Sequence, residues 1–173
     1  MILHRLAAAA VVALFGASFA LAAGPTDPQI AHIAYTAGVI DIEAAKLALQ
    51  KSQNAEVIAF ANSMVSDHEA VNEQALALVK KLGVTPEDND VSRSLKSGAE
   101  ASAATLNGLT GAAFDKAYID NEVTYHQAVL DALDKTLVPN AQNADLKGLL
   151  EKVRPAIAAH LERAKSIQAS LTK

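Results

Sequence analysis

Apolar residues recur at alternating spacings of three and four along four long stretches of this chain. That period matches one face of an α-helix, whereas a half-buried β-strand would alternate apolar and polar residues. The stripes run from Ile33 to Leu47, Val57 to Leu82, Phe114 to Leu133 and Leu146 to Leu171. Hydrophobic residues make up 51% of the chain and aromatic residues only 4%, which suits closely packed helices better than a β-sandwich. We therefore expect an all-α protein.

Capping residues, glycines and prolines mark the expected ends of these helices. Asn54 can cap the second helix and Gly83 can end it, whereas Pro139-Asn140 favours the turn before the last helix. The expected helices span about 27–51, 54–82, 92–106, 112–137 and from that turn to about 171. Two long hairpins joined by a crossover with a short helix are typical of a four-helix bundle with one long connection. Pro155 lies inside the last helix and is expected to kink or split it.

The first residues have the pattern of a targeting segment. A weakly basic start at His4-Arg5 precedes an apolar run from Leu6 to Phe19, and Ala20-Leu21-Ala22 resembles a peptidase cleavage site. The rival interpretation is an uncleaved membrane anchor, but the run is short for a hydrocarbon core of about 30 Å. We expect a signal peptide at 1–22 and one domain at 23–173, with its core at about 27–171. The signal-peptide pattern predicts export. No later segment is apolar enough to span a membrane, so we expect the mature protein in the periplasm.

Charge, cysteine content and motifs exclude several classes of function. The net charge is −4 with no basic cluster, so nucleic acid is not an expected partner. The absence of cysteine excludes disulfides, thiolate metal ligands and thiol catalysis. Neither a nucleophile elbow nor a zinc-protease motif occurs, which favours a protein that is not an enzyme, without catalytic residues or an organic cofactor. No motif indicates a protein partner or an oligomeric state.

Polar residues interrupt the apolar faces of three helices. Histidine replaces an apolar residue in two stripes, at His68 and His160. Glu122 and His126 are four residues apart and therefore share one face of the third long helix. Three imidazoles and at least one carboxylate are thus expected near the middle of the bundle. Neutral imidazole and carboxylate ligands suit iron, zinc, manganese or copper, and helical bundles build such sites from facing side chains.

The antiparallel pairing of the helices indicates which acidic residues reach this level. A turn near Gln53 puts His68 one helical turn from Asp41, and a turn near Asn140 puts Glu122 level with His160. The predicted metal ligands are His68, His126 and His160 with Asp41 or Glu122.

Two further acidic residues are alternates. Glu43 competes with Asp41, because each flanks the first apolar stripe by about a quarter-turn and each is also compatible with a solvated position. Asp67 flanks His68 in the same way and is a candidate for orienting that ring.

The spacing departs from the pattern of carboxylate-bridged di-iron bundles. That pattern carries Glu-x-x-His on two helices. Val65 and Ile157 occupy the positions three before His68 and His160, and Glu122 precedes its histidine by four. The sequence therefore favours a histidine-rich mononuclear site over a di-iron centre.

Two alternatives need no metal. The histidines can be structural residues in a polar layer that fixes the register of the helices. The chain would then be a non-catalytic envelope or stress-associated protein whose surfaces bind partners. A histidine cluster is also suited to sensing pH, since imidazole titrates near neutrality.

Three motifs resemble a family of exported bacterial proteins. They are Phe60-Ala61-Asn62-Ser63-Met64-Val65-Ser66-Asp67-His68 with Asn72, Phe114-Asp115-x-x-Tyr118 with His126, and Pro155 with His160-Leu161. The family is known as domain of unknown function 4142 and is grouped with ferritin-like folds. The resemblance covers about 27–171 and implies a four-helix bundle outside the cytoplasmic membrane. It also implies an acidic residue at Asp41, does not imply one at Glu122, and supplies no reaction.

Overall fold

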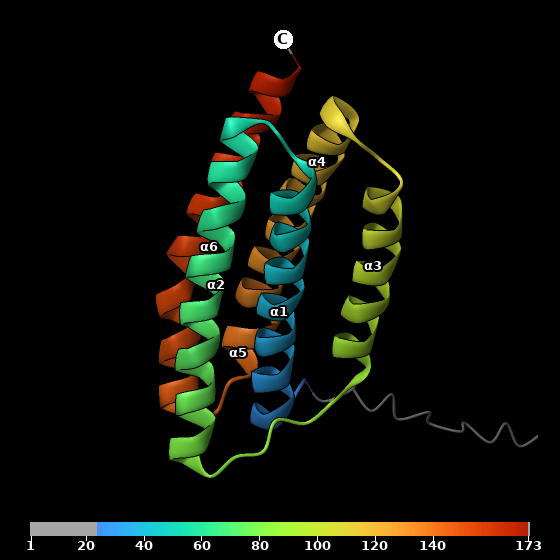
Figure 1. Cartoon of the computed structure of the whole chain (residues 1–173). Coiled ribbons are helices and arrows are strands. Elements are labelled where there is room, and N and C mark those ends of the chain that lie inside the picture. The colour runs from blue at the N-terminus through green and yellow to red at the C-terminus, as the bar shows by residue number, and fades with distance from the viewer. Residues whose placement is uncertain (1–23, 173) are drawn as a thin grey trace, which may run out of the picture.

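Four long helices form a bundle and a fifth helix lies outside it. The computed structural model describes residues 24–172, so the predicted signal peptide lies outside the described residues. The helices are α1 (Asp27–Lys51), α2 (Ala55–Leu82), α3 (Asp90–Asn107), α4 (Gly111–Ala132), a π-helical segment (Leu133–Leu137), α5 (Val138–Asn140) and α6 (Ala144–Leu171). Helices α1, α2, α4 and α6 form the bundle, with α3 beside α1 (Figure 1). The predicted all-α four-helix bundle is confirmed.

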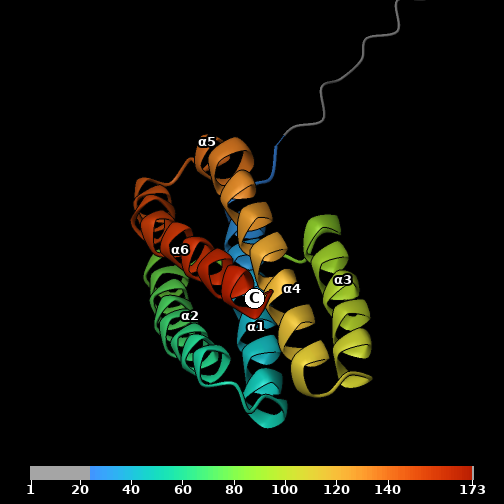
Figure 2. The same ribbon diagram turned by 90° about the horizontal axis from the view of Figure 1, so that it is seen from above.

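The chain forms two antiparallel hairpins, α1–α2 and α4–α6 (Figure 1). Residues 83–110 contain α3 and return the chain from one end of the bundle to the other, so that every neighbouring pair in the bundle is antiparallel. The view along the axis shows α1, α2, α6 and α4 around one centre, with α3 on the outer flank (Figure 2). No helix among residues 24–172 is long and apolar enough to cross a membrane.

Asparagine side chains start the helices that follow turns. The Asn54 side chain accepts hydrogen bonds from the N–H groups of Glu56 and Val57. Asn143 caps α6 in the same way, and Gly83 ends α2 in the left-handed conformation at φ +64°. These caps satisfy N–H and C=O groups that have no partner within the helix.

The turn predicted at Pro139-Asn140 is wrong, because the helical path continues through these residues. The π-helical segment widens the coil, and the N–H of Val138 donates to the carbonyl of Leu133. Pro139, which has no N–H to donate, is the second residue of α5, just after this widened coil. The turn follows Asn140, and the Asp27 carboxylate fixes it by accepting from two backbone N–H groups at 2.8 and 2.9 Å.

Pro155 does not split α6, which is continuous from Ala144 to Leu171. Its ring lies on the exposed side of the helix. Long helices curve with their convex side toward solvent, where backbone hydrogen bonds lengthen, so the exposed side tolerates the one bond that proline removes.

The core consists of two apolar clusters with a buried polar layer between them. One cluster surrounds Phe60 and Tyr118, and the other surrounds Ile33 and Leu150. On α1, α2 and α4 the polar residues fall between the positions that enter the two clusters, and on α6 His160 lies near the end of the stretch that enters the second cluster. The layer contains Asp41, His68, Glu122, His126 and His160, all of them buried.

Helix α1 has two apolar faces and not one. Ile33 and Ala45 point into the bundle, whereas Ile40 and Leu47, from the predicted stripe, line a groove against α3. The bundle-facing side is therefore rotated from the predicted stripe, and this rotation places Asp41 inside.

Replacing Gly38 by alanine is expected to destabilise the protein by about 1–2 kcal/mol, although alanine normally favours a helix interior. A Cβ atom on Gly38 would lie 2.9 Å from Cγ of the buried Asn72 side chain. Urea unfolding of Gly38→Ala, Asn72→Ala and the double variant tests this contact. In the Asn72→Ala background the added methyl should cost nothing, and an equal cost in both backgrounds would disprove the steric explanation.

Candidate metal centre

Each of the four bundle helices contributes to the polar layer. Asp41 comes from α1, His68 from α2, Glu122 and His126 from α4, and His160 from α6. The structure thus brings together all five residues that the sequence singled out as ligands. The alternate Glu43 lies outside the layer: it is exposed and lines the groove against α3, because it is about a half-turn around α1 from Asp41.

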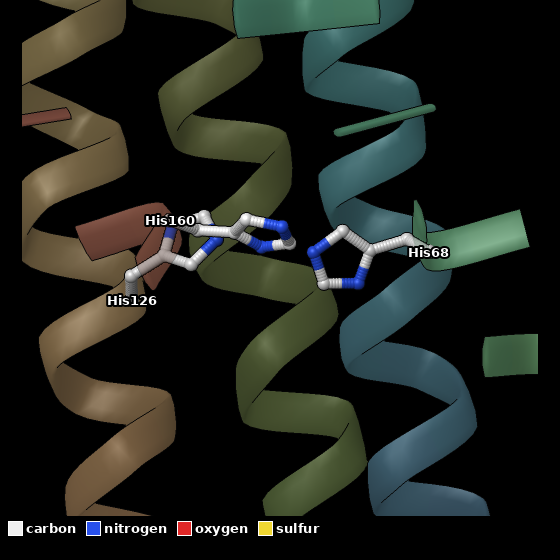
Figure 3. Close-up of side chains that lie close together, drawn as sticks. All are labelled: His68, His126 and His160. Carbon is white, nitrogen blue, oxygen red and sulfur yellow. The ribbon is translucent and has the colours of Figure 1, made fainter. Parts of the chain in front are cut away.

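The three imidazole rings face one another at one level of the bundle (Figure 3). The ring centroid of His160 lies 5.4 Å from those of His68 and His126, which are 6.0 Å apart from each other. One ring nitrogen of each residue lies within 4.8 Å of the others. Nitrogens bound to one tetrahedral ion would be about 3.3 Å apart, given bonds of about 2.0 Å. Movements of about an ångström would therefore complete a three-histidine site.

The carboxylate of Asp41 joins two of the histidines. Its Oδ2 atom lies 3.0 Å from Nε2 of His68 and 3.2 Å from Nε2 of His126. Burial opposes ionisation of Asp41, but the contact with His68 outweighs burial and holds the pKa of the carboxyl below its usual value. Asp41 is therefore an anion in the middle of the layer.

Glu122 lies on the other side of His126, where its surroundings oppose ionisation of the carboxyl. Burial first, and the neighbouring charge of Asp41 second, raise the pKa of Glu122 well above its usual value of 4.5. Glu122 Oε2 lies 3.4 Å from Nδ1 of His126, and the Nδ1–H of that ring donates to the backbone carbonyl of Glu122 at 3.0 Å. Asp41, Glu122 and His126 form a second group whose ligand atoms lie within 4.8 Å.

Two of the histidines are neutral at physiological pH. Burial lowers the pKa of His126 and of His160, and the nearby carboxylates only partly oppose it. Neutral imidazole is the form that binds metal ions, so burial prepares these rings as ligands.

Asp67 orients a different histidine from the one predicted. Its Oδ2 accepts a hydrogen bond of 2.9 Å from Nε2 of His160 on α6, and not from its neighbour His68. Consecutive residues of a helix point about 100° apart, so Asp67 is directed across to α6 while His68 enters the core. Asp67 is half-exposed, at the solvent edge of the layer.

The layer leaves several buried polar atoms without a hydrogen-bond partner of good geometry among the described residues. These atoms are both carboxylate oxygens of Asp41 and of Glu122, Nε2 of His68, Nε2 of His126 and Nδ1 of His160. A buried polar group without a partner costs about 1–3 kcal/mol. The same atoms are nitrogen and carboxylate donors that a borderline transition-metal ion prefers, so the donor set fits such an ion.

Asn72 is a buried neighbour of the layer that was not predicted as part of the site. It follows His68 by one helical turn on the same face of α2 and packs on Gly38. The signal was available, since a polar residue four after a buried histidine shares its face. Its position on α2 indicates a packing residue that holds α1 close to α2 beside His68.

Fold and site together define a helical bundle with a buried histidine–carboxylate layer at its centre. The family model described as domain of unknown function (DUF4142) matches residues 15–167, and the chain belongs to this family. Among solved structures it is similar to CopM in the Cu(II)-bound form, with a TM-score of 0.64 and 18% sequence identity over 84% of this chain and 98% of that one. A comparison with curated proteins found no match.

Proposed function

We propose that this protein binds one divalent transition-metal ion in the polar layer, through His68, His126 and His160 together with Asp41. The observation that carries the proposal is the convergence of unpartnered buried donors from all four bundle helices. Glu122 is the reserve ligand on the far side of His126 and would lose its proton on binding. The ion would neutralise the anionic layer and satisfy donors that the fold leaves without partners.

The ligand chemistry favours copper(II), followed by zinc. Three imidazoles and a carboxylate form a nitrogen-rich set, and such sites bind Cu²⁺ more tightly than Zn²⁺, Fe²⁺ or Mn²⁺. The likeness to CopM, whose structure is Cu(II)-bound, supports a site of this kind in this fold. Because all the ligands are buried, the proposed role is to hold the ion and not to process a substrate.

The test is the metal content of the protein produced without a histidine tag. Mass spectrometry after equilibration with Cu²⁺, Zn²⁺, Fe²⁺ and Mn²⁺ is expected to find about one equivalent of metal, with copper retained best. The variant with His68, His126 and His160 all changed to alanine should retain less than a tenth of it.

His32 provides the matched control, because it is a histidine of α1 that lies outside the layer and bonds to Ser92 at 2.8 Å. His32→Ala should bind as the unchanged protein does. If the unchanged protein takes up no metal, the layer is a structural polar network. If the triple variant binds equally well, the site lies elsewhere.

We also propose that the ion is bound outside the cytoplasmic membrane. The signal-peptide pattern of residues 1–22 supports this location.

A further inference from the structure

His126 and His160 are held in opposite tautomers by their hydrogen bonds. In His126 the Nδ1–H donates to the carbonyl of Glu122 at 3.0 Å, which leaves Nε2 unprotonated, with its lone pair free to bind a metal ion. In His160 the Nε2–H donates to Oδ2 of Asp67 at 2.9 Å, which leaves Nδ1 free. The two unprotonated nitrogens, Nε2 of His126 and Nδ1 of His160, are both buried and accept no hydrogen bond from the described residues.

We infer that Asp67 is a positioning residue that locks His160 in the Nε2–H tautomer and so makes Nδ1 its ligating atom. This inference rests on the proposed metal function and specifies its coordination set: Nε2 from His126 and Nδ1 from His160. A carboxylate on the outer nitrogen of a metal-binding histidine fixes the tautomer and orients the ring. Asp67 does so across two helices, from the solvent edge of α2 to α6.

The hydrogen bond from His160 to Asp67 matters because no other carboxylate lies against the His160 ring among the described residues. His68 and His126 both lie within 3.2 Å of the Asp41 carboxylate, whereas His160 has no such contact with Asp41 among the described residues. Without Asp67, the imidazole of His160 would be free to exchange between its two tautomers. Because Asp67 is half-exposed, water competes for its carboxylate and weakens the hydrogen bond to His160. Loss of this hydrogen bond should therefore weaken metal binding without abolishing it.

Long-range ¹H–¹⁵N spectra of the histidine rings test the inference directly, since they distinguish the tautomers. In the metal-free protein, His160 is expected as the Nε2–H form and His126 as the Nδ1–H form. On addition of Zn²⁺, which is diamagnetic, the coordination shift should appear at Nδ1 of His160 and at Nε2 of His126.

Variants at Asp67 provide the second readout. Asp67→Ala should mix the His160 tautomers and lower Zn²⁺ affinity about tenfold, the low end for a carboxylate behind a ligand. Asp67→Asn keeps an acceptor oxygen, so it should keep the tautomer and lose less affinity. Glu69→Gln is the matched control, because Glu69 is a similarly exposed acid on α2 whose partner is Lys46, at 3.1 Å. It should change neither readout.

Failures of the two proposals are distinguishable. If the unchanged protein binds no Zn²⁺ or Cu²⁺, the metal function falls and the ligand assignment falls with it. If metal binds but the shift appears at Nε2 of His160, or if Asp67→Ala leaves the tautomer unchanged, the metal function stands and the role of Asp67 is overturned.

Discussion

Replacing Glu122 by glutamine is expected to stabilise the metal-free protein at neutral pH, by up to about 3 kcal/mol. Glu122 is fully buried beside the Asp41 anion, and its raised pKa means that the folded protein holds a proton that the unfolded chain releases. Glutamine has nearly the same shape and can donate to Asp41 from its amide without holding this proton. The substitution therefore removes the free-energy cost of taking up this proton on folding and keeps the packing.

The stabilisation should depend on pH in one direction. Below the ordinary value of 4.5, Glu122 is protonated in both states and the two proteins should be about equally stable. As the pH rises above that value, the unfolded chain ionises while the folded protein does not, so the natural protein loses about 1.4 kcal/mol per pH unit relative to the variant. The loss ends only when the pH reaches the raised pKa of the folded state.

Urea unfolding in the presence of a chelator, at pH 4.5 and pH 7.5, measures the effect. Glu43→Gln serves as the control, because Glu43 is exposed and its change should be neutral at both values. An equal difference for Glu122→Gln at the two pH values would contradict a buried, protonated Glu122. The same variant should bind metal more weakly, because glutamine lacks the carboxylate ligand. Glu122 would then favour metal binding while destabilising the metal-free fold.

His126→Gln is expected to lower metal affinity by at least about a hundredfold, more than the loss caused by altering a residue behind a ligand. His126 is fully buried and belongs to both groups of converging donors, the three histidines and the Asp41–Glu122 pair. Its loss breaks both groups at once. Glutamine fills most of the volume of the ring and lacks a strong donor for copper or zinc.

His160→Gln gives the comparison, because His160 belongs to one group only. Competition titrations with Cu²⁺ and Zn²⁺ should rank the losses as His126→Gln above His160→Gln. Thermal unfolding without metal checks that both variants are folded. The reverse ranking would show that the ion is centred nearer α6 than α4.

The sequence predicts the layer well where a residue interrupts a clear stripe. His68, His160 and the Glu122–His126 pair follow from periodicity alone, because helix period and antiparallel pairing determine which residues share a level. The choice between Asp41 and Glu43 does not follow from the residues of α1. It depends on α3, which packs against the flank of α1 and turns a second apolar face outward.

Two other features depend on contacts that are distant in sequence. The partner of Asp67 is His160, which is 93 residues away, and proximity in sequence pointed to His68 instead. The turn after Asn140 is displaced because a π-helical segment accommodates Pro139, and the Asp27 carboxylate holds the turn from the other end of the domain. Local patterns carry no information about either contact.

The buried layer takes its donors from both hairpins, Asp41 and His68 from one, Glu122, His126 and His160 from the other. The chain joins these hairpins by one connection, and it has no cysteine. A bound ion would therefore act as a reversible cross-link between the two halves of the molecule. Because the site exists only in the folded chain, the ion would stabilise the fold by about 2.7 kcal/mol at a free concentration of about 100 times its dissociation constant. This contribution would vanish whenever the ion is withdrawn, so metal supply would set how firmly the two hairpins hold together.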